Sequence, residues 1–311
     1  MRARKDGLEL RVVSALSMLG SGLGEMYELE RAERYLHECI AFAEACEVTP
    51  WYARAWLALV EVYGARWDDG ASRARNVLVH PVDPISKISS LIALGRVRAR
   101  RGDPGAQEAL DDALELALPG GHLQRLGHVH AARAEAAWLA GDCERAVEEA
   151  RAAFPLALEK RHLWFAGELA YWQSKAGVLK EPPEWIAEPY RLQLAGAHRA
   201  ASEAWRARGC PYEAARALAE SDDDEALLEA LAELERLGAG PAAKLTRLAL
   251  RARGVAVPRG PRPSTRANPA ELTARELDVL RLVAAGKRNA EIAAELVLSP
   301  RTVDHLSLIH I

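Results

Sequence analysis

Amphipathic helical segments follow one another from about residue 8 to residue 253, separated by short breaks that contain Gly, Pro or Asp. The breaks lie at residues 67–70, 102–105, 141–142 and 209–211. No run of alternating β-branched residues bounded by turn residues occurs among them, so no strand is predicted. Ala, Leu, Glu and Arg dominate the composition, and these residues lose little conformational freedom in a helix. We therefore expect an all-α fold.

A self-similar unit recurs around these breaks. Each unit has a helix with small and large apolar residues, a tight turn, and a second helix that starts near an alanine. The steps between the first four of these alanines are 39, 35 and 40 residues, and two further steps of 34 on average reach the last; the alanines are Ala32, Ala71, Ala106, Ala146 and Ala214.

This pattern resembles the tetratricopeptide repeat (TPR), whose period is about 34 residues. The pairs Leu19-Gly20 and Leu94-Gly95 correspond to the Leu-Gly position of that family. The resemblance implies helix pairs that stack into a curved solenoid, whose concave surface binds a protein or a small-molecule effector. We predict that residues 1–253 form a TPR-like sensor or interaction region.

The tryptophans of this region allow two interpretations. Trp51, Trp56, Trp164, Trp172 and Trp205 could line the concave surface, or they could fill gaps between helices. The second interpretation is favoured, because large aromatic side chains usually supply buried area.

No pattern in the chain indicates catalysis or a bound cofactor. Gly286-Lys287 lacks the rest of a P-loop, and neither GxSxG nor HExxH occurs. His128 and His130 would point in different directions on a helix, so no metal site is expected. Neither a signal peptide nor an apolar run of about 20 residues is present. We expect a soluble cytoplasmic protein that is not an enzyme, has no cofactor and does not contact a membrane.

The composition changes at about residue 254. Residues 254–270 are rich in proline and contain no acidic residue, which predicts a basic linker. Seven basic residues and no acidic ones lie between positions 242 and 270: Lys244, Arg247, Arg251, Arg253, Arg259, Arg262 and Arg266. The linker is either a solvated tether or an additional source of phosphate attraction, since the net charge of −3 excludes a uniformly basic protein.

A helix-turn-helix pattern follows the linker. The residues of positions 273–276 form a capping box that starts a helix with Leu277, Leu280, Val283 and Ala284 on one face, and Gly286 ends it. Asn289 is predicted to cap a second helix with Ile292, Ala293 and Leu296 facing inward. Ser299 and Pro300 then start a third helix in which Val303 packs inward.

In register, residues 272–276, 279–280, 286, 289–293, 296 and 299–303 resemble the LuxR-type (GerE-like) DNA-binding domain. The resemblance implies that the third helix enters the major groove of double-stranded DNA. It also implies DNA contacts from Arg301, Asp304 and His305, with Thr302 and Lys287 or Arg288 near phosphates. The full set of predicted nucleic-acid-binding residues is Lys287, Arg288, Asn289, Ser299, Arg301, Thr302, Asp304 and His305.

A LuxR-type domain behind helical repeats is similar to the large MalT-like regulators, which carry an ATPase module upstream; this chain has no such module. The LuxR resemblance, assigned to residues 271–305, ends where Ser307 and His310 replace expected apolar positions. We expect residues 306–311 to be a non-native tail on a truncated domain, so that the chain as written binds DNA weakly or not at all.

These observations predict a LuxR-type transcriptional regulator: the helical repeats receive a signal or partner, and a homodimer binds promoter DNA. The alternative is a helical-repeat interaction scaffold without DNA binding. An ATP-dependent regulator would require a longer parent protein with a P-loop upstream of Met1.

Overall fold

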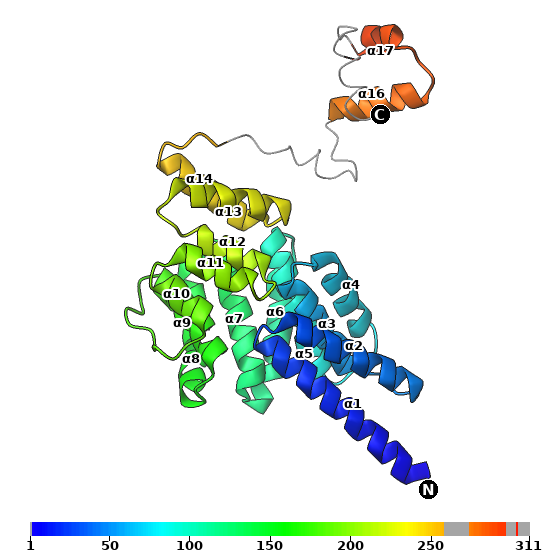
Figure 1. The fold of residues 1–311 in the computed structure, drawn as a ribbon, viewed down its shortest axis with the longest axis vertical. Helices are drawn as coiled ribbons and strands as arrows, with labels where there is room; N and C mark the ends of the chain where they lie inside the picture. Colours follow the sequence, from blue (N-terminus) through cyan, green and yellow to red (C-terminus); the bar gives the residue numbers. More distant parts are fainter. Residues whose placement is uncertain (1, 258–273, 297–302, 304–311) are drawn as a thin grey trace. The chain divides into compact units, whose positions relative to one another are not determined.

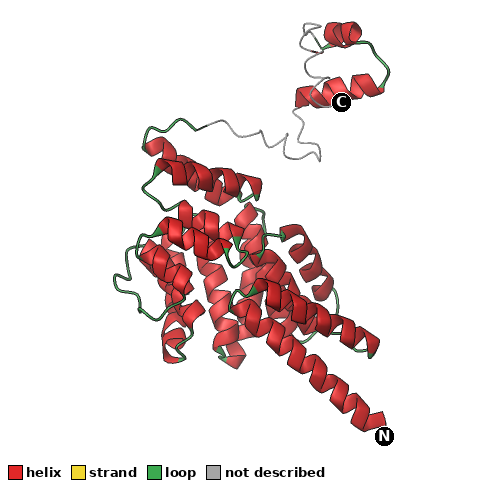
Figure 2. Cartoon of the chain, in the orientation of Figure 1, coloured by secondary structure: helices red, strands yellow, loops and turns green. Residues whose placement is uncertain are grey.

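A computed structural model describes residues 2–257, 274–296 and 303 of the chain. Every regular element in these residues is helical, and they contain no strand (Figure 2). The prediction of an all-α fold is therefore confirmed. The chain divides into two compact units, residues 1–257 and residues 258–311, which we call the helical array and the C-terminal unit.

The helical array is built from successive helices that pair as hairpins, most clearly α1 with α2, α3 with α4, α5 with α6, and α7 with α8 (Figure 1). The elements are α1 (Arg2–Glu25), α2 (Leu29–Ala45), α3 (Trp51–Tyr63), α4 (Trp67–Leu78), α5 (Pro84–Arg101), α6 (Ala106–Ala117), the 3₁₀ turn η1 (Leu118–Gly120), α7 (Leu123–Leu139), α8 (Cys143–Glu159), α9 (Leu163–Lys175), α10 (Glu188–Leu194), α11 (His198–Arg206), α12 (Pro211–Leu218), α13 (Asp224–Arg236) and α14 (Gly240–Ala252).

The alanines that marked the repeat all lie in the second helix of a hairpin: α2, α4, α6, α8 and α12. The same close contact between a glycine and a leucine recurs within two of the hairpins. A Cβ atom at Gly20 would lie 2.6 Å from Cγ of Leu36, and one at Gly95 would lie 2.5 Å from Cγ of Leu110. Each leucine follows the alanine of its hairpin by one helical turn. Glycine is therefore needed at these two positions for the paired helices to approach closely.

Three of the four predicted breaks separate helices. Residues 102–105 lie between α5 and α6, residues 141–142 between α7 and α8, and residues 209–211 at the start of α12. The prediction of a break at residues 67–70 was wrong, because this segment is the first turn of α4. Gly70 is there for packing: a Cβ atom would lie 2.8 Å from the carbonyl oxygen of Ala58 in α3.

The inner side of the array is filled by aromatic side chains. The ring of Tyr27, in the turn after α1, lies 4.8 Å from that of Trp164 in α9 and 5.2 Å from that of Trp205 in α11. Trp56, Trp164, Trp172 and Trp205 are buried, and Trp51 is partly buried. The tryptophans thus mainly fill gaps between helices, as the favoured interpretation held. Through Tyr27, the first hairpin also meets α9 and α11, which lie far along the chain.

Candidate nucleic-acid interface

The C-terminal unit contains the helices α16 (Ala274–Ala284) and α17 (Asn289–Glu295). As predicted, Gly286 ends the first helix: its φ is 76°, a left-handed value that favours glycine. Its amide donates to the carbonyl of Val283 at 2.9 Å, and the Lys287 amide donates to that of Leu282 at 3.1 Å. This pair of bonds satisfies the last carbonyls of α16 and sets the direction in which the chain enters α17.

The start of α17 differs from the prediction by one residue. Arg288 is the N-cap, and Asn289 is the first residue of the helix. The Glu291 carboxylate accepts a hydrogen bond from the Arg288 backbone amide at 2.8 Å and one from its Nη2 atom at 3.3 Å. The backbone hydrogen bond, followed by the one from the Arg288 side chain, lowers the pKa of Glu291. A carboxylate in the first turn performs the capping that we had assigned to the Asn289 side chain.

A small core holds the described helices of the unit together. Its buried members are Val279, Ile292, Ala293 and Val303, against which Leu282, Val283 and Leu296 pack. The predicted inward positions of Ile292, Ala293, Leu296 and Val303 are confirmed. Of the face predicted for the first helix, Val283 packs against the core, but Leu280 is 39% exposed and Ala284 is exposed, so the prediction was wrong for these two. The side chain of Leu277 lies outside the described residues. The buried face of α16 passes through 279, 282 and 283, which is the other phase of the same helical period.

Three of the predicted DNA-contacting residues lie together at the junction of α16 and α17: Lys287, Arg288 and Asn289. Lys287 and Arg288 are exposed, and Asn289 is partly exposed. The others, Ser299, Arg301, Thr302, Asp304 and His305, lie outside the described residues, as does the capping residue Thr273.

The two basic side chains at this junction already contact carboxylates of α17. The Lys287 ammonium pairs with Glu295, and Arg288 pairs with Glu291 at 3.3 Å. Exposed pairs of this kind are weak and are screened by salt. A phosphate could therefore replace the carboxylate partner of either side chain at little cost, which is the chemistry that a DNA backbone contact requires.

Over the described residues, the helical array and the C-terminal unit define an all-helical protein with a helix-turn-helix module at its C-terminus. Comparison with family models matches residues 270–307 to the GerE model, described as bacterial regulatory proteins, luxR family. The chain therefore carries a LuxR-family helix-turn-helix domain, the DNA-binding module of a class of transcriptional regulators. Searches of curated proteins and of solved structures gave no match.

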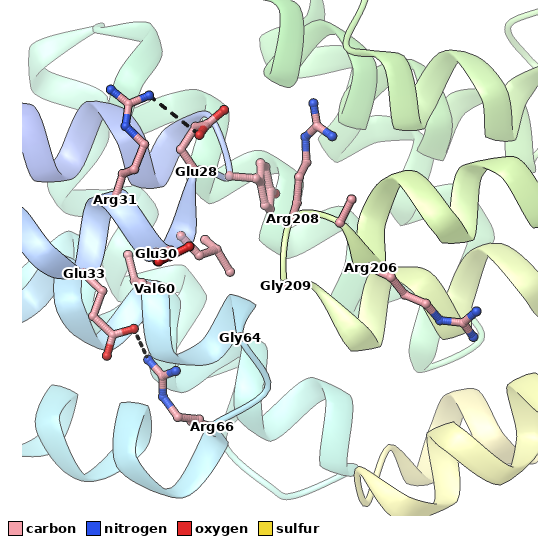
Figure 3. Close-up of a pocket in the computed structure, with 13 residues that line it drawn as sticks. Glu28, Glu30, Arg31, Glu33, Val60, Gly64, Arg66, Arg206, Arg208 and Gly209 are labelled. Carbon is pink, nitrogen blue, oxygen red and sulfur yellow. Dashed lines mark hydrogen bonds and ion pairs between the residues drawn. The ribbon is translucent and has the colours of Figure 1, made fainter.

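The array contains cavities that the sequence analysis did not predict. One of about 590 Å³ lies where the turn between α1 and α2 and the end of α3 face the loop before α12 (Figure 3). Most of its charged side chains pair with one another or with neighbours: Arg66 with Glu33 at 2.8 Å, and Arg206 with Glu229 at 2.5 Å. Helix pairs far apart in sequence form its walls, so no local pattern could have revealed it.

The residues that the structure describes contain no group of three or more His, Cys, Asp or Glu side chains that could hold a metal ion. Among the same residues, no helix is both long enough and apolar enough to cross a bilayer.

Proposed function

We propose that this protein regulates transcription as a homodimer on DNA, with the helical array as the part that receives a signal from a small molecule or a protein. The LuxR-family match carries the DNA-binding part of the proposal. The array's hairpins, with their recurring alanine and glycine positions, support a TPR-like repeat region over residues 1–253, followed by a basic linker over 254–270 and the helix-turn-helix over 271–305.

The proposed readout of DNA combines two kinds of contact. Arg301, Asp304 and His305 contact base edges in the major groove, and Thr302, Lys287 and Arg288 contact phosphates. The burial of Val303 in the small core supports this assignment. A helical residue whose side chain packs inward leaves the residues two before it and one or two after it on other faces.

Fluorescence anisotropy with a labelled DNA duplex tests the proposal, with a version of the chain in which a complete LuxR-type fourth helix replaces residues 306–311. The logarithm of the affinity should fall linearly with the logarithm of the salt concentration between about 50 and 200 mM, because phosphate contacts release counterions. Arg288→Ala should weaken binding to all sequences and reduce the salt slope by about 1. Arg301→Ala should weaken binding to a preferred operator more than binding to random duplex.

The same assay separates the regulator from the scaffold alternative. Salt-insensitive binding to a protein, without any binding to duplex DNA, would favour a scaffold. A comparison of this version with the chain as written tests the role of the tail. We expect this version to bind DNA more tightly, and equal affinity would contradict our interpretation of the tail.

A further inference from the structure

A second cavity in the array, of about 230 Å³, lies between the last hairpin and the helices before it. Trp138 of α7, Tyr171 and Trp172 of α9, and Tyr212 of α12 form its aromatic side. Leu245 is among the residues of α14 that form the opposite, mainly aliphatic side. The cavity is smaller than the usual 300–1,000 Å³ of a drug-sized site, so it suits a small ligand.

Arg216 of α12 contributes an unusual group to this cavity. Arg216 is 7% exposed. Its guanidinium carbon lies 4.7 Å from the ring centre of Tyr171 and 5.2 Å from that of Trp172. Within the part of the chain that the structure describes, its Nε and Nη2 atoms have no hydrogen-bond acceptor. The side chain also forms no salt bridge with any of these residues. The aromatic rings thus hold the guanidinium but leave hydrogen-bond donors unused.

The unused atoms of Arg216 are the pair that binds a carboxylate side-on elsewhere in the array. In Arg73, Nε and Nη2 donate to the two oxygens of Glu61 at 2.9 and 2.7 Å. In Arg236, the same two atoms donate to Glu233 at 2.8 and 2.7 Å. This parallel pair of charge-assisted bonds is the strongest arrangement available to an arginine.

Two more donors on the cavity wall lack an acceptor among the described residues: Nε1 of Trp172 and the hydroxyl of Tyr212. The indole N–H can only donate, and a phenol can donate or accept. Buried donors without a partner cost free energy, so a ligand that brings several acceptor oxygens would stabilise this wall.

The other charges of the cavity are already paired. Lys175 Nζ lies 2.9 Å from Glu220 Oε1, and Glu220 also accepts hydrogen bonds from Tyr171 and Gln193. The carboxylates of Glu135 and Glu213 interact electrostatically with Arg216, and both form salt bridges with Arg100. Their charges balance that of Arg216 at a distance but do not occupy its donors.

We propose that this cavity binds a small organic carboxylate with an apolar or aromatic body. The carboxylate pairs side-on with Arg216, and the body lies between Trp138 and the aliphatic side chains of α14. This inference deepens the proposed function, and rests on it in one respect: the ligand is the signal that the array receives. The site joins α9 and α12 to α14, the last helix before the C-terminal unit.

Isothermal titration calorimetry on the full chain, with phenylacetate and indole-3-acetate as probes, tests the site directly. Saturable binding is expected, together with a change in tryptophan fluorescence, since Trp138 and Trp172 line the cavity. The uncharged amides of the two probes should bind about tenfold more weakly or not at all, because they lose the charge-assisted hydrogen bonds. No saturable binding of either acid, or equal binding of acids and amides, would overturn the proposal.

Two matched variants on α14 locate the binding. Leu245→Trp, at a lining residue, should abolish binding by filling the cavity, whereas Leu248→Trp, at an exposed residue of the same helix that does not line it, should leave binding unchanged. Equal binding by both variants would contradict this site. The titrations need no DNA, so a failure of the DNA-binding proposal would appear only in the anisotropy assay.

Discussion

Arg100 in α5 donates a hydrogen bond from Nη2 to Oε1 of Glu213 in α12 at 2.7 Å, across 113 positions of sequence. Both side chains are fully or almost fully buried. Arg100 also pairs with Glu135 of α7, which pairs in turn with Arg96. These ion pairs therefore connect α5 with α7 of the next hairpin and with α12, which lies far along the chain.

Removal of Arg100 should be strongly destabilising. Arg100→Met leaves the carboxylates of Glu135 and Glu213 buried without this partner, and breaking a buried pair costs about 3–5 kcal/mol. The free energy of unfolding, measured by urea denaturation, should fall by about that amount. Arg101→Met is the matched control: Arg101 is the next residue and pairs with Asp68, whose side chain is 89% exposed, so the loss should stay below about 1 kcal/mol. Equal losses would show that Arg100 is not buried as described.

Acid should weaken the array through the same cluster. Burial raises the pKa of Glu135, but the charges of Arg100 and then Arg96 lower it further, to about 2. The folded state therefore binds protons less readily than the unfolded state. The stability from this group is fully present above about pH 4.5 and is lost as the pH falls towards 2, a change of about 3 kcal/mol. Glu25 and Glu149 also have pKa values of about 2, so they add to the loss.

Urea denaturation between pH 7 and pH 3 measures this dependence. Glu135→Gln should lower stability at pH 7 and flatten the acid side of the curve, since one titrating carboxyl has been removed. Glu148→Gln, at an exposed position of α8, should leave the curve as in the parent chain. An unchanged acid slope in Glu135→Gln would contradict the assigned pKa.

Two glycines of α1 should respond in opposite directions to alanine. Gly20→Ala places a methyl group 2.6 Å from Cγ of the buried Leu36, and such overpacking costs about 1–3 kcal/mol. Gly22→Ala meets no atom within 4 Å, so the better helix propensity of alanine should raise stability by about 0.5–1 kcal/mol. Thermal unfolding of both variants checks this pair. Destabilisation by both would show that the first hairpin packs differently.

Truncation of a side chain in the small core should unfold the C-terminal unit and leave the array folded. Ile292→Ala removes a fully buried side chain, at a cost of about 2–5 kcal/mol, from a core with four buried members among the described residues. In the version with a complete fourth helix, DNA binding should be lost. All eight tryptophans lie in the array, so the fluorescence-detected urea midpoint should not change. Leu280→Ala, at an exposed position, should preserve DNA binding; if it did not, Leu280 would belong to the core after all.

Much of the local structure could be predicted from the sequence. The end of α16 at Gly286, the inward side chains of Ile292 and Val303, and the turn at residues 102–105 all follow from turn chemistry and helical period. These depend on residues within one or two turns of each other, so their pattern is visible in the chain itself. The same rules misplaced Leu280, because helical period alone leaves the phase of a helix open. They also misplaced the start of α4, because Gly70 indicated a break but serves the close packing of α4 on α3.

The sequence by itself thus determined an all-helical chain, its repeated hairpins and its LuxR-type module. Only the tertiary structure decided that Tyr27 meets Trp205, that Arg100 meets Glu213, and that Arg216 lies at a cavity with unused donors. The physical reason is curvature. Small rotations between successive hairpins add up along the array, and their sum decides which distant side chains come together.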